Sequence, residues 1–342
     1  MVLSIEKQNE IKSLLLDTFR RAPLDLKDEY IDILFSRSND DISLFEQVCQ
    51  SVNRAEEFDL ESSLESFFGA KMSPIHKGSK SNCYFFETDG SKKVVKSNLI
   101  SDDTDCKGLV NFLSFLSDTY FNEYLSSLGV EVPDYLGRHV VGASVNHVMS
   151  YVKGINLERI IRPVEEEAVF ENYSPLNVAL GVCKILVDYE ALGFVHGDLS
   201  PAQFILSRDD VVGTDYGFSR FVSAKNIFED LLFIYGTCGY LAPEVFGDFS
   251  ERIDNKEDIF SAGMIIAELL GAENYQRFKI QYLKSIYWES EVLALDSHIL
   301  FMDDFLYNGS VKELLYACTE INPKNRPTAL EMNKVIINNL SN

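Results

Sequence analysis

The sequence predicts an α+β protein with two lobes preceded by a helical extension. The chain has 342 residues, which is more than one domain of about 100 to 200 residues usually holds. Apolar residues recur every three or four positions through residues 1–70, a spacing typical of amphipathic helices. From about Ile75 the pattern changes to that of strands and later returns to that of helices. We therefore expect a helical extension over 1–70, a small β-rich lobe over 71–152 and a large helical lobe over 153–342.

The composition indicates a packed and strongly acidic protein. Apolar residues make up 46% of the chain, and its formal net charge is -22. Such a charge disfavours nucleic acid as a partner, because phosphate backbones are bound by lysine and arginine. It also disfavours an anionic membrane surface. A protein substrate with a basic surface suits it better.

The sequence carries no recognisable signal for export or membrane insertion. No run of about 18 apolar residues predicts a transmembrane helix, and the start, MVLSIEKQNE, lacks the charged-then-apolar pattern of a secretory signal. The six cysteines are scattered without a CxxC pair, so we expect reduced thiols and neither a disulfide framework nor a zinc site. These features favour a cytoplasmic protein, or one delivered into a host cell if the source is a bacterial pathogen.

Two roles are open for the helical extension. Its amphipathic segments, such as the one that carries Leu60, Leu64, Phe67 and Phe68, could pack on the domain that follows and stabilise it. Alternatively, they could bind a regulator.

The most informative stretch runs from His196 to Gly217 and reads HGDLSPAQFILSRDDVVGTDYG. Asp198 and Asp215 each stand beside a glycine, and between them two short apolar runs flank the turn-like SRDD. This pattern predicts a loop, a tight hairpin and a second loop. The hairpin would hold both carboxylates at one end of a small sheet, one for a hydroxyl and one for a cation. Phosphoryl transfer uses such a pair.

This stretch resembles the protein kinases. HGDLSPAQFIL is similar to the family's catalytic loop, HRDLKPENLLI, and GTDYG is similar to its magnesium-binding DFG segment. The resemblance implies a serine/threonine protein kinase that uses ATP and Mg²⁺. Asp198 would then take the proton of the attacking hydroxyl. Asp215 would bind magnesium, with Gln203 at the position of the second magnesium ligand.

The resemblance extends to the residues that would bind ATP. Lys96 ends VVK, which resembles the family's VAIK, and its ammonium would lie on the phosphates of the nucleotide. Glu123, in the helical segment FLSFLSDTYFNEYLSSLG, is the implied ion-pair partner of this lysine. The glycine-rich loop is degenerate, because HKGSKSNCYFF keeps only the middle glycine, Gly78.

The hinge between the two lobes is identified in HVMSYVKGINL. By resemblance, Met149 takes the gatekeeper position, and Ser150, Tyr151 and Val152 offer backbone groups to the purine. Gly154 suits an extended connector.

Other parts of the resemblance are structural. GTCGYLAPE would form the floor on which a peptide substrate lies, with Glu244 paired to Arg326. Asp258, at the start of a buried helix, would brace the catalytic loop, and His196 would be buried and hydrogen-bonded rather than a general base. All these features follow one another in the family's order between about residues 75 and 335.

Gly197 replaces an arginine that in many kinases receives an activation-segment phosphate. Three other departures keep other functions open: the degenerate glycine-rich loop, Ser200 in place of a lysine that touches the transferred phosphate, and Gln203 in place of asparagine. The alternatives are a pseudokinase that binds nucleotide or partner proteins as a scaffold, and an enzyme of kinase fold that transfers another group, such as AMP.

Overall fold

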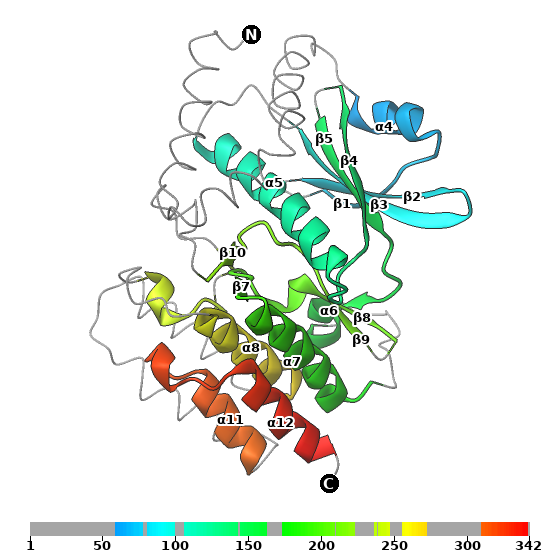
Figure 1. Ribbon diagram of the computed structural model, residues 1–342. Helices are drawn as coiled ribbons and strands as arrows, with labels where there is room; N and C mark the ends of the chain where they lie inside the picture. The colour runs from blue at the N-terminus through cyan, green and yellow to red at the C-terminus, as the bar shows by residue number, and fades with distance from the viewer. Residues whose placement is uncertain are drawn as a thin grey trace. The chain divides into compact units, whose positions relative to one another are not determined.

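The computed structural model describes ten stretches of the chain (Figure 1). These stretches are residues 59–77, 81–99, 106–142, 144–162, 173–208, 210–222, 236–237, 239–246, 255–271 and 309–340. Gly78 and the helices expected before Asp59 lie outside them. The chain divides into two compact units, and the main boundary between them falls between Tyr151 and Val152. A β-rich unit and a helical unit confirm the α+β fold class, and each unit is described by itself.

The first unit is built on a five-stranded antiparallel sheet with the order β1-β2-β3-β5-β4. Strands β2 and β3 are joined by Asp89 and Gly90, which have φ values of 53° and 71°. Two consecutive positive φ angles define the hairpin turn that suits the twist of paired strands. The strands are β1 (Ser73–Lys77), β2 (Asn82–Thr88), β3 (Ser91–Leu99), β4 (Tyr135–Val141) and β5 (Ser144–Ser150).

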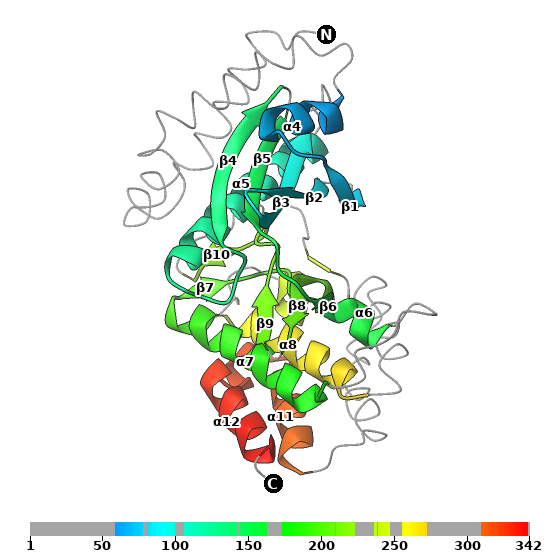
Figure 2. The ribbon, with the colours of Figure 1, turned by 90° about the vertical axis from the view of Figure 1, so that its right-hand side faces the viewer.

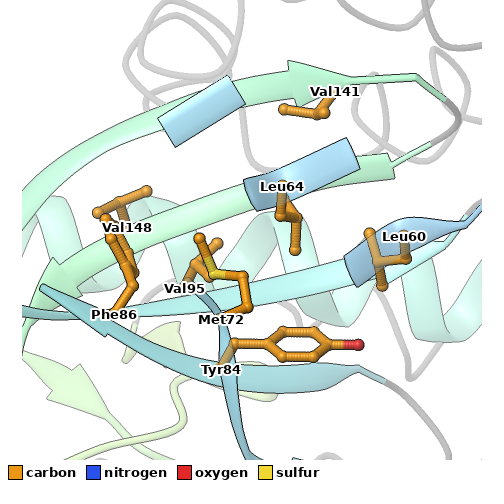
Figure 3. Close-up of a cluster of buried hydrophobic side chains, with 8 residues drawn as sticks. All are labelled: Leu60, Leu64, Met72, Tyr84, Phe86, Val95, Val141 and Val148. Carbon is orange, nitrogen blue, oxygen red and sulfur yellow. The ribbon is translucent and has the colours of Figure 1, made fainter. Parts of the chain in front are cut away.

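One face of this sheet packs on helix α4 (Leu60–Phe68). The side chain of Asp59 caps the helix by accepting a hydrogen bond from the amide of Ser62, and Gly69 ends it at a φ of 63°. Residues of α4 and of four strands, together with Met72 from the segment between α4 and β1, form one buried apolar cluster (Figure 3): Leu60, Leu64, Met72, Tyr84, Phe86, Val95, Val141 and Val148. The last helical segment before the sheet is therefore part of the core of this unit.

The opposite face of the sheet carries polar side chains toward helix α5 (Cys106–Ser127). Lys96 lies directly across from Cys83 on one neighbouring strand and from His147 on the other. Residues paired in this way point to the same face of a sheet. Lys96 and His147 therefore share a face, and Asp118 of α5 lies within reach of both.

The second unit is mainly helical, with two small sheets of order β6-β8-β9 and β10-β7. Helix α8 (Lys256–Leu269) is buried along most of its length, and α7 (Pro175–Ala191) lies beside it (Figure 2). Among the helices that the structure describes, none has the length and apolar character that a bilayer crossing needs. The remaining elements are β6 (Ile155–Asn156), α6 (Leu157–Ile161), β7 (Phe194–Val195), η1 (Pro201–Gln203), β8 (Phe204–Ser207), β9 (Asp210–Gly213), β10 (Arg220–Phe221), η2 (Pro243–Phe246), α11 (Ser310–Cys318), η4 (Pro323–Asn325) and α12 (Ala329–Leu340).

The hairpin expected between the two aspartates is present. Strands β8 and β9 pair antiparallel, with Phe204 opposite Gly213 at one end and Ser207 opposite Asp210 at the other. Asp198 precedes β8 and Asp215 follows β9, so the chain brings both aspartates to the same end of the hairpin. Gly154 lies against this hairpin, where a Cβ atom would come within 2.3 Å of the carbonyl oxygen of Leu206. This close approach explains why glycine occupies position 154.

Candidate active site

The loop that carries Asp198 is fixed through its backbone to helix α8. The carboxylate of Asp258 accepts hydrogen bonds from the amides of His196, at 2.7 Å, and Gly197, at 3.0 Å. Asp258 is 1% exposed, and a buried carboxylate requires such partners. The predicted bracing role of Asp258 is confirmed.

His196 holds the loop to the segment before Asp215. Its Nε2 lies 3.1 Å from the carbonyl oxygen of Thr214, and its Nδ1 lies 3.3 Å from the amide of Asp198. A carbonyl oxygen only accepts and an amide only donates, so the ring is the neutral tautomer with its proton on Nε2. Both nitrogens are engaged and the side chain is fully buried, which confirms the expected structural role.

The carboxylate of Asp198 is oriented by Thr237. The hydroxyl of Thr237 donates to Oδ1 of Asp198 at 2.7 Å. Gly236 precedes this threonine at a φ of 115°, and a Cβ atom there would come within 2.3 Å of Leu241. A glycine is therefore required at the point where the chain places Thr237. The sequence prediction missed this residue, although its position inside GTCGYLAPE was the available signal.

Two of the departures from the kinase pattern contact each other. The hydroxyl of Ser200 donates to Oε1 of Gln203, and both side chains are buried. The backbone of Gln203 also fixes Thr214, because its carbonyl oxygen accepts from the amide at 2.9 Å and from the hydroxyl at 3.1 Å. Ser200 and Gln203 therefore form one unit, which their separate positions in the sequence did not reveal.

Asp215 has a backbone conformation that residues other than glycine rarely adopt. Its φ is 66°, in the left-handed region, and its side chain is exposed. The next residue, Tyr216, is buried, and its hydroxyl accepts a hydrogen bond from Tyr189 at 3.2 Å. Non-glycine residues in this conformation are concentrated at functional sites. The carboxylate of Asp215 and the amide oxygen of Gln203 are the hard oxygen donors that Mg²⁺ prefers, so the chemistry of this pair fits a magnesium site.

Lys96 is paired with Asp118, and this corrects the expected partner. Its Nζ lies 2.8 Å from Oδ2 of Asp118, which is nearly fully buried. The sequence prediction had named Glu123, which lies five residues later in the same helix. Five residues turn an α-helix by about 140°, so Asp118 and Glu123 occupy different faces. Among the described residues, Asp118 thus forms the ion pair with Lys96 that the prediction gave to Glu123.

A polar chain lies behind this ion pair. Nδ1 of His147 is 3.9 Å from Oδ2 of Asp118, and its Nε2 is 3.0 Å from Oδ1 of Asn122. The amide nitrogen of Asn122 in turn donates to the carbonyl oxygen of Pro133 at 2.9 Å. Burial by itself raises the pKa of Asp118, but Lys96 and His147 outweigh this effect and hold that pKa well below its ordinary value. Asp118 is therefore an anion that anchors Lys96.

The expected hinge lies at the end of β5. The amide of Ser150 donates to the carbonyl oxygen of Asp134 at 2.9 Å, and the amide of Tyr151 donates to that of Lys92 at 3.2 Å. These two amides are thus engaged inside the first unit. Within the described part of the chain, the amide of the third expected hinge residue, Val152, makes no backbone hydrogen bond of this kind.

The GTCGYLAPE segment is anchored by buried polar contacts. Glu244 and Arg326 form a two-pronged ion pair with distances of 2.5 and 2.7 Å, which confirms the predicted pairing. Breaking one side of such a pair typically costs about 3–5 kcal/mol. Tyr240 is held as well, since its hydroxyl donates to Glu268 at 2.6 Å and accepts from Arg162 at 2.7 Å. The segment therefore has a rigid base in the second unit.

Comparisons with known proteins agree with this geometry. The model of the protein kinase domain family matches residues 129–335, and the chain belongs to the protein kinase family. Two receptor-like protein kinases of Arabidopsis thaliana are among its relatives. Both are described as similar to the leaf rust 10 disease-resistance locus receptor-like protein kinase. The relative numbered 2.1 is 29% identical over 65% of this chain and 32% of its own length. The relative numbered 2.2 is 25% identical over 72% of this chain and 39% of its own length.

The chain spans between about a third and two fifths of the length of these two relatives. A crystal structure of a kinase domain matches 78% of this chain and 95% of its own with a TM-score of 0.58 and 14% identity. This structural match establishes the fold.

Proposed function

We propose that this chain is a serine/threonine protein kinase that transfers the γ-phosphate of ATP to a protein hydroxyl. The observation that carries the proposal is the fixed position of Asp198. Its backbone neighbours are bound to buried Asp258, and its carboxylate accepts a hydrogen bond from Thr237. A carboxylate oriented in this way from two sides suits a general base.

In the proposed mechanism Asp198 receives the proton of the attacking hydroxyl. Thr237 donates to Oδ1 of the same carboxylate and thereby helps to orient it. A positioned base of this kind contributes about 100- to 10,000-fold to the rate. The anchored segment from Gly236 to Glu244 supports a peptide substrate, and the net charge of -22 favours a basic one.

Lys96 and the hinge are the proposed ATP-binding groups. Asp118 holds the ammonium of Lys96 at 2.8 Å, and this ammonium would bind the phosphates. Backbone groups of Ser150, Tyr151 and Val152, with Met149 beside them, would bind the purine. The amides of Ser150 and Tyr151 already donate to carbonyl oxygens of the first unit. We therefore propose that the purine contacts carbonyl groups of the hinge and the amide of Val152. We propose Asp118 rather than Glu123 as the ion-pair partner of Lys96, and Gly78 stays a prediction as a nucleotide-binding residue.

Asp215 and Gln203 are the residues that would hold Mg²⁺. The cation would neutralise charge on the phosphates during transfer. The hydroxyl of Ser200 fixes the amide of Gln203, and an amide oxygen has a second lone pair for a cation. Ser200 would thus position Gln203.

The same Ser200–Gln203 contact favours the alternative of a pseudokinase, because the amide oxygen that would serve as ligand already accepts a hydrogen bond. The intact set of Lys96, Asp118, Asp198 and Asp215 favours an enzyme. Transfer of AMP is the other alternative for the altered loop.

Incubation with magnesium, a basic protein and ATP labelled at either the α or the γ phosphate distinguishes these functions. We expect only the γ label to appear on protein, and on serine or threonine after hydrolysis. Retention of the α label would indicate transfer of AMP. Magnesium-dependent ATP binding with neither label transferred would support the pseudokinase.

The activity is expected to be independent of phosphorylation between Phe218 and Ala242. Gly197 stands where an arginine would bind a phosphate on that segment, so such a phosphate would have one cation fewer to contact. We expect phosphatase-treated and untreated protein to transfer phosphate at rates within about twofold, because the loop is anchored by Asp258 instead. A large loss on treatment, traced by mass spectrometry to a residue of this segment, would refute the expectation.

A further inference from the structure

Three charged side chains are buried together behind the catalytic loop. Asp258 and Glu257 are adjacent in α8, with exposures of 1% and 6%, and Arg220 of β10 is 5% exposed. The guanidinium of Arg220 lies 3.1 Å from Oε2 of Glu257. Of these three residues, only Asp258 had a predicted role, which was to brace the catalytic loop. Neither Arg220 nor Glu257 has a part in the mechanism described so far.

Opposing electrostatic effects act on the pKa of Asp258. Burial and the charge of Glu257 raise the pKa of Asp258 to about 7, while the amides of His196 and Gly197 and the charge of Arg220 oppose this rise. His196 contacts Asp258 through its backbone amide, while its ring nitrogens contact Thr214 and Asp198.

Tyr189 of α7 also interacts with Asp258. Burial is the main cause that raises the pKa of Tyr189, and the charge of Asp258 adds to it. Tyr189 therefore stays a neutral phenol near pH 7. Among the described residues that face Asp258, Glu257 and Arg220 thus supply the charges.

We propose that the Arg220–Glu257 pair makes the catalytic loop respond to pH, by setting whether Asp258 is charged and so holds the amides of both His196 and Gly197. An ionised carboxylate offers an acceptor to each amide, whereas a protonated one carries a donor on one oxygen. Protonation therefore weakens one of the two bonds beside Asp198. Arg220 and Glu257 are positioning residues, because they act through Asp258. The inference rests on the proposed phosphotransfer, whose regulation it describes.

Activity and stability should respond to pH in opposite directions. An aspartate with a raised pKa in the folded state binds its proton more tightly than the unfolded chain does. Its contribution to stability is therefore full at low pH and is lost as the pH rises through about 7. Order in the loop, and with it phosphate transfer, increases over the same range.

The amide of Gly197 provides a readout that does not require activity. His196–Gly197 is the only His-Gly sequence in the chain. Labelling with carbonyl-¹³C histidine and ¹⁵N glycine therefore selects a single amide signal by NMR. In the unaltered protein we expect this signal to titrate with a midpoint near 7, set by Asp258. Asp258→Asn should abolish the titration.

Two substitutions should move this midpoint in opposite directions. Glu257→Gln removes a like charge and should lower the midpoint by about one pH unit, while Arg220→Met removes an opposite charge and should raise it by about one unit. Arg220→Lys keeps the charge and should stay close to the unaltered protein. Glu313→Gln, an exposed change of the same kind on α11, is the control for net charge.

The pH dependence of phosphate transfer, measured as kcat and KM from about pH 5.5 to 9, should shift in parallel with the NMR midpoints. A Gly197 signal that does not titrate, that still titrates in Asp258→Asn, or that moves the same way in both substitutions overturns the inference. If Arg220→Met fails to fold, Glu257→Gln alone decides the direction. Absence of transfer at every pH, with the NMR shifts as expected, would instead count against the proposed function.

Discussion

Replacement of Asp198 by Asn is expected to lower phosphate transfer from ATP by about 100- to 10,000-fold. Asparagine keeps the shape of the side chain and can accept the hydrogen bond that Thr237 donates at 2.7 Å. It cannot take the proton of the attacking hydroxyl. The measurement is incorporation of the γ label into a basic protein under conditions that saturate the enzyme with ATP.

Asp210→Asn is the matched control for this experiment. Asp210 is an exposed aspartate at the other end of the β8–β9 hairpin, opposite Ser207. Its substitution makes the same chemical change in the same hairpin, and the rate should stay within about twofold of the unaltered protein. Both variants should give thermal unfolding curves close to that of the unaltered protein. Full activity in the Asp198 variant would remove this residue from the mechanism.

Replacement of Asp118 by Asn is expected to lower kcat/KM for ATP by about 100- to 1,000-fold, a loss typical of removing one preorganised electrostatic contact. The carboxylate is buried beside Lys96 at 2.8 Å, and its removal leaves the ammonium without that anion. Glu123→Gln should stay within about twofold, because Glu123 lies on another face of α5. Steady-state kinetics with varied ATP give both values.

The pair can be tested further with a double-mutant cycle. Lys96→Met and Asp118→Asn should each cause most of the loss, and the double variant should lose little more, because both act on one interaction. Losses that multiply in the double variant would contradict a shared role. An activity loss in Glu123→Gln equal to that in Asp118→Asn would restore the partner that the sequence had indicated.

The sequence predicted those parts of the site that depend on local order along the chain. The hairpin between Asp198 and Asp215 follows from two short apolar runs and a turn, and these form a strand pair wherever the surroundings allow it. The distant pair of Glu244 and Arg326 was found because each lies inside a short motif with a known partner. The bracing of the loop by Asp258 was found in the same way.

Contacts that depend on side-chain placement were missed. Asp118 and Glu123 lie in the same predicted helical segment, and the helix face decides between them. The buried residues Phe115, Phe121 and Leu125 mark a stripe that includes Asp118 and excludes Glu123, so helical periodicity held the signal. The contacts of Thr237 with Asp198 and of Ser200 with Gln203 left no such periodic signal, because each depends on how two loop segments fold.

The packing of α4 has a practical consequence for recombinant expression. A shortened chain that starts at β1 would leave the side chains beneath Leu60 and Leu64, among them Tyr84 and Val95, facing water. Each of these two leucines contributes about 1.5–3 kcal/mol by burial, and an uncovered sheet face of this kind promotes aggregation. Fragments meant for crystallisation or binding assays should therefore begin upstream of Asp59, so that the capped helix is retained.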